Sequence, residues 1–200
     1  MDTPPAMTAF RAVLLVLLVP LLLGAALAPS TPATWTPAPW TFDREGSRIE
    51  MSVRAFGVSH AGQFDDWRGT AILDPARPQD TRASMTVQSG SLKMSPSAAT
   101  SRAIGPAFLD AARYPTIRFE LRSLVPLGGD RYTARADVTM KGRTRAIDFP
   151  VDLRLGRDRA QLTGAFTLDR ADFGIGTSGP WNRLVGRQVT VRVALQARPT

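Results

Sequence analysis

Residues 131–155 read RYTARADVTMKGRTRAIDFPVDLRL, and this stretch decides the fold of the chain. Apolar residues alternate with mostly polar ones on both sides of a short turn at Lys141-Gly142-Arg143. Alternation with a period of two is typical of β-strands that have one buried and one solvated face. A short turn between two such runs predicts an antiparallel hairpin.

The same pattern continues in both directions from this hairpin. Between Arg48 and Ala197 the chain contains eight alternating runs, separated by turn residues and by one helix-like stretch at residues 96–114. Antiparallel strands in this number can close into a barrel that holds one small ligand. We therefore predict an all-β fold, an eight-stranded antiparallel up-and-down barrel with one short helical insertion. The second run is expected at residues 63–73, after a turn at residues 57–62 and with a bulge at Asp65-Asp66.

The N-terminal residues have a different character from the rest of the chain. Residues 12–28 read AVLLVLLVPLLLGAALA, an uncharged apolar run that follows Arg11. This layout is typical of a secretory signal peptide, and its length also suits a membrane anchor that is not cleaved. We expect a signal or anchor helix at residues 1–28, a Pro-rich linker at 29–39 and the barrel at 40–200. Export to the periplasm or secretion follows from this organisation.

The composition excludes several kinds of site. The sequence has no cysteine and one histidine, His60, so thiol chemistry and a multi-histidine metal site are excluded. His60 is expected in a solvent-facing turn. The net charge of +8 favours anionic partners such as a membrane surface. The arginines are spread along the strands without a stacking motif or a basic helix, so we do not expect binding to nucleic acid.

The predicted inner face of the barrel is almost free of polar atoms. It combines large side chains with small residues, among them Ala55, Gly69, Ala71, Ala83, Ala134, Ala136 and Gly164. Such a face either packs solid or leaves an apolar channel, and the pattern alone leaves both open. A guest in such a channel would gain about 25 cal/mol for each Å² of apolar surface buried.

No motif of catalysis is recognisable in the sequence. The spacing of Gly174 to Gly179 matches G-x-G-x-x-G, but phosphate binding needs a strand before and a helix after the motif within a βαβ unit, and here Pro180-Trp181 and a Val-rich strand follow. Neighbouring carboxylates at Asp65-Asp66 more commonly serve a turn than acid–base chemistry. We therefore expect that the protein is not an enzyme and needs neither a metal nor a cofactor.

One motif resembles a known family. The stretch DRADFGIG, residues 169–176, is similar to the Arg-x-Asp-Phe-Gly-Ile-Gly signature of the YceI-like family of exported polyisoprenoid-binding proteins. Further matching pieces occur before it in the family's order, at residues 40–43, 62–69, 108–119 and 138–144, so the resemblance covers residues 40–197. It implies a lipocalin-like barrel that holds the tail of a long isoprenoid lipid or quinone, without catalysis. The stretch at residues 100–104 departs from the family's Arg-Asp-x-His-Leu element, which puts the head-group preference in doubt.

The candidate binding residues follow from the inner face and this resemblance. We expect the ligand to contact the barrel lining and mouth at Met51, Val53, Phe64, Trp67, Met85, Phe108, Leu109, Tyr114, Phe119, Leu121, Ala136, Phe149 and Phe166. Phe108, Leu109 and Tyr114 lie in the helical insertion, which can act as a lid. In the signature we expect a structural role. Arg170 and Asp172 pair there, Phe173 plugs the barrel rim, and Gly174 and Gly176 allow a backbone path closed to other residues.

The resulting functional hypothesis is non-catalytic binding, transport or storage of a long-chain isoprenoid lipid or quinone in the bacterial periplasm. The alternative is a filled barrel that docks on a partner or an anionic membrane through its Arg-rich surface. The sequence leaves open the tail length, the head group, the cleavage of the leader and the oligomeric state, a homodimer included.

Overall fold

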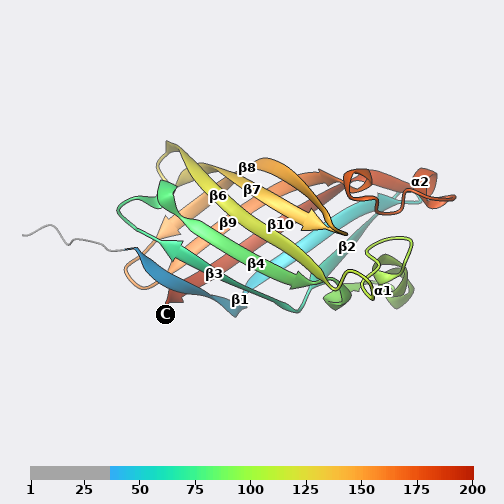
Figure 1. Ribbon diagram of the computed structural model, residues 1–200, viewed down its shortest axis with the longest axis horizontal. Helices are drawn as coiled ribbons and strands as arrows, with labels where there is room; N and C mark the ends of the chain where they lie inside the picture. The colour runs from blue at the N-terminus through green and yellow to red at the C-terminus, as the bar shows by residue number, and fades with distance from the viewer. Residues whose placement is uncertain (1–36) are drawn as a thin grey trace, which may run out of the picture. The chain divides into compact units, whose positions relative to one another are not determined.

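An antiparallel sheet closes on itself in this protein because its first and last strands pair (Figure 1). In the computed structural model, which describes residues 37–200, β1 (Ala38–Ala55) runs beside β10 (Val185–Pro199). The pairing extends from Trp40 opposite Pro199 to Ala55 opposite Val185. The predicted signal or anchor segment at residues 1–28 lies outside the described residues. β1 begins at Ala38, two residues before the predicted start of the barrel at residue 40.

Ten strand segments make up the eight barrel strands. β2 (Val58–Phe64) and β3 (Trp67–Leu73) both pair with β1, one after the other along its length, and so act as one interrupted strand. β4 (Arg82–Gln88) pairs with β3 and β5 (Leu92–Met94) pairs with β2, which gives a second interrupted strand. The others follow in chain order: β6 (Thr116–Gly128), β7 (Arg131–Met140), β8 (Arg143–Leu155) and β9 (Ala160–Asp169). The prediction of an eight-stranded, up-and-down, antiparallel barrel is confirmed.

The start of the second run was predicted wrongly. The chain reverses at Phe56-Gly57, where both residues have positive φ (53° and 80°), and β2 begins directly afterwards at Val58. His60 therefore lies within a strand, opposite Val53, and not in a turn. At Asp65-Asp66, where a bulge was expected, the sheet is interrupted, and the backbone bonds to the facing interruption instead. Asp65 N donates to Ser91 O at 3.3 Å, and Gln88 N donates to Asp66 O at 2.8 Å.

A bulge in β1 lets both halves of this long strand face the interior. The register against β10 shifts between Asp43 and Arg48. Because a strand alternates with a period of two, Phe42 and Ile49 would point to opposite faces of a regular strand. With the bulge, both side chains line the interior of the barrel.

The helical insertion caps one end of the barrel. α1 (Ser97–Ile104) contains three alanines, which favour helix, and ends at Gly105, whose N–H donates to Arg102 O. Thr100 fixes it to β5, because its Oγ1 accepts from Met94 N at 2.8 Å and donates to Met94 O at 3.1 Å. The chain then turns through residues 105–115 before β6. α2 (Trp181–Leu184), which we did not predict, lies at the same end of the barrel (Figure 1).

Short 3-10 turns complete the structure, at Pro78–Asp80, Ser89–Ser91 and Arg170–Phe173. The end of the barrel away from α1 and α2 is closed by a cluster of buried side chains, Trp40, Ala71, Leu73, Ala160 and Ala197. Within residues 37–200, every helix is too short or too polar to span a lipid bilayer.

Candidate functional site

The barrel encloses a cavity of about 460 Å³, within the range of small-molecule binding pockets. All eight barrel strands contribute to its wall, and the lining is almost entirely aliphatic and aromatic. β10 contributes five inward side chains, Val185, Val189, Val191, Val193 and Leu195. Of the two states that the sequence left open, the hollow barrel is the one observed.

Most of the predicted lining and mouth residues face this cavity: Met51, Val53, Phe64, Met85, Phe108, Leu109, Phe119, Leu121, Phe149 and Phe166. Three others do not line it. Trp67 is 3% exposed and lies behind Phe42, with ring centroids 6.4 Å apart, so that Phe42 faces the cavity in its place. Ala136 is buried in the wall. Tyr114 is not part of the lining, and its ring lies near the side chains of Arg113 and Lys141. Contact of the lining residues with a ligand stays a prediction.

The small residues of the inner face serve two different purposes. Ala55, Ala83 and Ala134 line the cavity. Gly69 and Gly164 do not, because neighbouring side chains already cover them. A Cβ at Gly69 would lie 3.0 Å from Phe42 Cδ2, and one at Gly164 would lie 2.9 Å from Val151 Cγ1. These glycines therefore make room for the wall of the barrel and not for a guest.

Solvent-exposed members of the lining mark where the cavity opens. Phe56, which is 61% exposed, belongs to the β1–β2 turn, and the exposed Pro96, Ala98 and Arg102 belong to α1 and its start. We call the end of the barrel formed by the β1–β2 turn, α1 and α2 the mouth (Figure 1).

Trp181 of α2 connects the segments around the mouth. Its ring meets Phe56 and Phe108 edge to face, with centroids 6.4 and 6.0 Å apart. The Cζ atom of Arg102 lies 4.3 Å from the centroid of the same ring, a cation–π distance. Sequence reasoning missed both Trp181 and Arg102, since a single aromatic residue in a loop and a single arginine on a helix carry no periodic signal.

The signature arginine has a structural role, but its partners are not those expected. Arg170 is 2% exposed, and its guanidinium donates to five backbone carbonyl oxygens, those of Ile175, Gly176, Asn182, Val185 and Gly186, at 2.6–3.3 Å. The predicted pair with Asp172 is wrong. The turn at Arg170–Phe173 is capped by Asp169, whose Oδ1 accepts from Ala171 N at 2.9 Å, and it leaves Asp172 exposed.

The same contacts explain the charge state of this group. Burial lowers the pKa of Arg170 from its ordinary value, and the nearby carboxylate of Asp169 opposes that shift. Since the pKa of an arginine lies far above neutral pH to begin with, the guanidinium stays protonated. It therefore holds the loop of residues 175–186 by charge-assisted hydrogen bonds and is not free to bind a ligand.

The rest of the signature positions the loop that carries Phe108. Phe173 is 1% exposed and packs with Phe108, Met140 and Leu168. Gly174 and Gly176 have φ values of 68° and 60°, as expected for glycine, which has no Cβ to oppose this conformation. Gly176 N donates to Ala107 O at 2.8 Å, and Lys141 Nζ donates to Phe108 O at 2.8 Å. Four segments of the chain thus meet at Phe108.

Polar groups are scarce in the lining. Among the described residues, the lining includes four with charged, imidazole or hydroxyl side chains: His60, Ser84, Arg102 and Arg170. Ser84 is exposed, and Arg170 is fully occupied by carbonyl groups. His60 and Arg102, near the mouth, remain for a polar head group. No group of three or more His, Asp or Glu side chains within residues 37–200 could hold a metal ion.

Comparison with known proteins adds independent findings. A family model described as the YceI-like domain matches residues 40–197. A UPF0312 protein of Pseudomonas syringae pv. tomato is 28% identical over 182 residues, which cover 86% of this chain and 94% of that protein. A UPF0312 protein of Pseudomonas fluorescens is 25% identical over 163 residues, 77% of this chain and 85% of that protein.

Solved structures share the fold. The crystal structure of Burkholderia cenocepacia BcnA has a TM-score of 0.73 at 23% identity, covering 78% of this chain and 98% of that one. A polyisoprenoid binding domain from Saccharophagus degradans, implicated in plant cell wall breakdown, has a TM-score of 0.65 at 17% identity, covering 82% of this chain and all (100%) of that one.

Proposed function

Because the chain belongs to the family of YceI-like proteins, we propose that it binds one long-chain isoprenoid lipid, a polyisoprenoid or an isoprenoid quinone, inside its barrel. The hydrocarbon tail occupies the cavity, and the head group stays at the mouth near His60 and Arg102. The residues that contact the tail are those of the predicted set that line the cavity, with Phe42 and the valines of β10 added to them.

The observation that carries this proposal is the apolar, enclosed character of the cavity. A polar substrate would leave its hydrogen-bonding groups without partners along the barrel axis, at a cost of a few kcal/mol for each group. A hydrocarbon tail has no such groups and gains free energy in proportion to the apolar area that leaves water. The polyisoprenoid-binding domain of Saccharophagus degradans, which shares the fold, supports an isoprenoid tail over other hydrocarbons.

Binding without catalysis fits the groups that the lining offers. His60 and Arg102 lie among aliphatic and aromatic side chains, without a neighbouring nucleophile or carboxylate in the lining of the described cavity. Transport or storage is therefore the proposed role. With a leader that directs export, the compartment is the periplasm or the cell exterior, where a lipid tail needs a carrier to cross water.

The test is the content of the purified protein. The full chain is expressed, purified without detergent and extracted with organic solvent, and the extract is analysed by mass spectrometry. We expect an isoprenoid lipid in a ratio near one per protein chain, and uptake of a polyprenyl probe after delipidation. An extract without lipid, together with no uptake of the probe, would contradict the proposal and favour an interaction module that docks on a partner or a membrane.

A further inference from the structure

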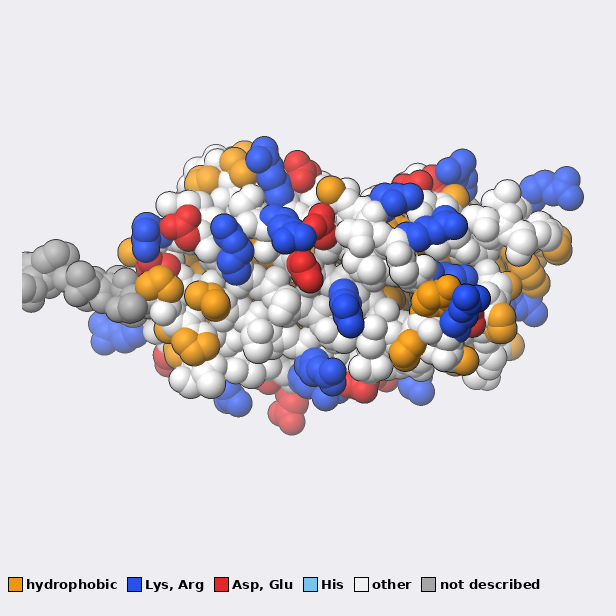
Figure 2. Space-filling view, in the orientation of Figure 1, with side chains coloured by type: hydrophobic (Ala, Val, Ile, Leu, Met, Phe, Trp, Pro, Cys, Tyr) orange, Lys and Arg blue, Asp and Glu red, His pale blue; other side chains and the backbone are white. Residues whose placement is uncertain are grey.

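Exposed apolar side chains gather on the rim of the mouth. Phe56 is 61% exposed, Val58 58% and Leu184 42%, and these three residues are here called the apolar rim. They lie on two adjoining segments, because Phe56 N donates to Leu184 O at 3.0 Å. The space-filling view shows hydrophobic side chains, with Lys and Arg beside them, at the end that carries α1 and α2 (Figure 2).

The position of Phe56 is unusual for a residue without a binding role. Its φ of 53° and the φ of 80° at Gly57 make a turn in which both central residues are left-handed. Asn, Asp and Gly favour the first position of such a turn, and a bulky side chain is an outlier there. Phe56 nevertheless exposes most of its ring to solvent, with an edge contact to Trp181 as its aromatic partner. A strained backbone that presents an aromatic ring to water points to a function for that ring.

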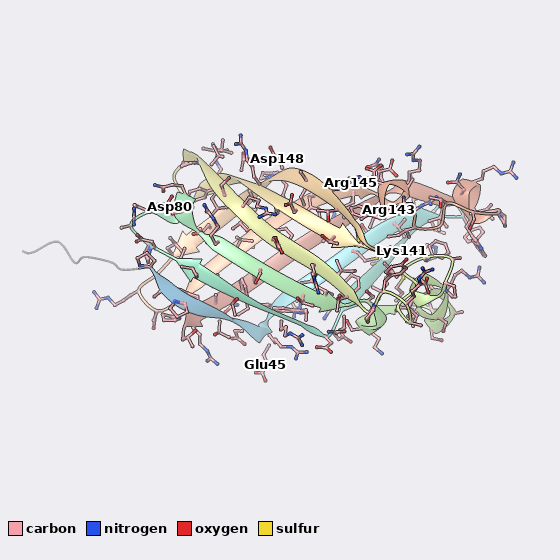
Figure 3. The ribbon with its side chains drawn as sticks, in the orientation of Figure 1. Glu45, Asp80, Lys141, Arg143, Arg145 and Asp148 are labelled. Atoms are coloured by element: carbon pink, nitrogen blue, oxygen red, sulfur yellow. The ribbon has the colours of Figure 1, made fainter. Side chains whose placement is uncertain are left out.

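The positive charge of the barrel is concentrated at the same end. The segments at this end, residues 54–62, 92–115, 138–147 and 169–188, contain three acidic residues, Asp110, Asp169 and Asp172, against ten basic ones: Arg54, Lys93, Arg102, Arg113, Lys141, Arg143, Arg145, Arg170, Arg183 and Arg187. Figure 3 shows Lys141, Arg143 and Arg145 on the side of the barrel toward α2, with Asp80 near the other end. Among the described residues, Arg54, Arg102 and Arg183 form no ion pair with an acidic side chain.

The opposite end of the barrel is balanced in charge. Its turns, at residues 74–80, 127–131 and 156–159, contain Asp74, Asp80, Asp130 and Asp158 together with Arg77, Arg131, Arg157 and Arg159. Ion pairs form there, between Arg77 and Asp74 at 3.1 Å and between Arg154 and Asp130 at 3.9 Å. The arginines are therefore spread along the chain, but at the mouth the basic residues outnumber the acidic ones, and Asp169 is paired with Arg187 there.

We propose that the mouth docks on an anionic lipid bilayer. Phe56, Val58 and Leu184 enter the boundary between head groups and acyl chains, and Arg54 and Arg183 meet the lipid phosphates. Apolar side chains flanked by arginine are the combination that binds such an interface. The inference rests on the proposed function, because it sets the opening of the cavity against the source of the lipid. The tail then passes from bilayer to barrel without crossing water.

The test is binding of the purified protein to vesicles of phosphatidylcholine with and without phosphatidylglycerol. All variants are expressed and purified in the same way as the wild type, so that any contribution of residues 1–36 to binding is the same in each. We expect binding to the anionic vesicles that falls with salt. Pure phosphatidylcholine vesicles should bind much more weakly.

Two pairs of substitutions separate the contributions. Arg54→Gln with Arg183→Gln should weaken binding about 25-fold, since each charge near an anionic surface contributes about fivefold. Val58→Thr with Leu184→Gln should weaken it about tenfold through lost apolar burial. The matched control, Arg157→Gln with Arg159→Gln at the opposite end, should change it less than about twofold, because charges beyond the Debye length are screened.

Lipid loading distinguishes the failure of this inference from the failure of the proposed function. None of these six residues lines the cavity, so extracted lipid per chain should be the same in every variant. Two outcomes would contradict the docking proposal without contradicting the proposed function. One is lipid-loaded protein that does not bind anionic vesicles, and the other is vesicle binding that the control pair weakens as much as the mouth pairs do. Docking by protein that never contains or takes up lipid would overturn the proposed function instead. Recovery of a bound protein partner that masks the apolar rim would also overturn the docking proposal.

Discussion

Phe108 packs directly against the backbone of Gly176, so closely that a Cβ on Gly176 would lie 2.8 Å from Phe108 Cε1. The signature glycine and the mouth aromatic are therefore two halves of one contact, although 68 positions separate them in the sequence. Since the φ of Gly176 is 60°, the position excludes other residues through its backbone as well as through its neighbour.

Gly176→Ala should destabilise the barrel by about 2–4 kcal/mol, as left-handed strain and the clash with Phe108 add. Gly179→Ala is the matched control, because its φ is 63° and no atom lies within 4 Å of the added Cβ. The control should cost only the strain, about 1–2 kcal/mol. Urea unfolding measures both, and equal losses would show that the Phe108 contact carries no energy.

Arg170→Lys should cost about 2–5 kcal/mol, because an ammonium cannot serve five carbonyl groups arranged around a planar guanidinium. Arg187→Lys is the control. Arg187 is 62% exposed and pairs with Asp169 at 2.7 Å, and such a surface pair contributes less than about 1 kcal/mol. Guanidinium chloride unfolding compares the two variants. A small effect at Arg170 would mean that the loop of residues 175–186 is held by its packing alone.

Asp169 should make part of the stability dependent on acid. The hydrogen bond from Arg187, followed by that from the Ala171 backbone, lowers the pKa of Asp169. A depressed folded-state pKa gives stability that is present above the unfolded value of about 3.9 and is lost as the pH falls below it. Asp169→Asn should therefore lose less stability than the wild type between about pH 5 and pH 2. Parallel unfolding curves of the two proteins over this range would contradict the assignment.

Phe56→Asn should raise the thermal stability slightly, by about 0.5–1 kcal/mol, because asparagine suits the left-handed turn and little burial is lost. Differential scanning calorimetry at constant pH measures the change. Ile72→Asn, at an exposed apolar residue in β3, has no such turn to improve and should not stabilise the protein. A large loss of stability in Phe56→Asn would show that its contact with Trp181 supports the fold rather than a docking surface.

The parts of the fold that the sequence predicts well are those where local pattern and turn chemistry agree. In the β7–β8 hairpin the two strands occupy the alternating runs of the sequence, and the turn lies at Lys141-Gly142, where the glycine predicted it. The start of β2 was missed because its turn has Phe56 where Asn or Asp would signal a hairpin. α2 was missed because four residues are too short for a periodic pattern.

The sequence predicts which side chains point toward the barrel interior, but not which of them form the surface of the cavity. Alternation placed Trp67 inside, yet it cannot tell that Phe42 of the neighbouring strand reaches further toward the axis and covers it. The partners of Arg170 were missed for a related reason. They are carbonyl groups, which every residue carries, and only the path of residues 175–186 brings them together. A charged pair two positions apart was the simpler expectation and was wrong.

The central claim, that the cavity holds a lipid tail, is tested most directly by reducing the cavity and measuring the lipid. Ala83 lines the cavity, whereas Ala165 is exposed on β9, so Ala83→Phe and Ala165→Phe add the same side chain to the inside and the outside. Val191→Phe provides a second, independent obstruction from β10. Circular dichroism and the unfolding midpoint confirm that each variant is folded before lipid is measured.

The decisive measurement is the mass of lipid extracted per folded chain from these variants and the wild type. We expect about tenfold less lipid in Ala83→Phe and Val191→Phe, since overfilling a packed site costs about 1–3 kcal/mol, and a wild-type amount in Ala165→Phe. The same lipid in the same amount from all four proteins would contradict the account, because the lipid would then lie outside the barrel.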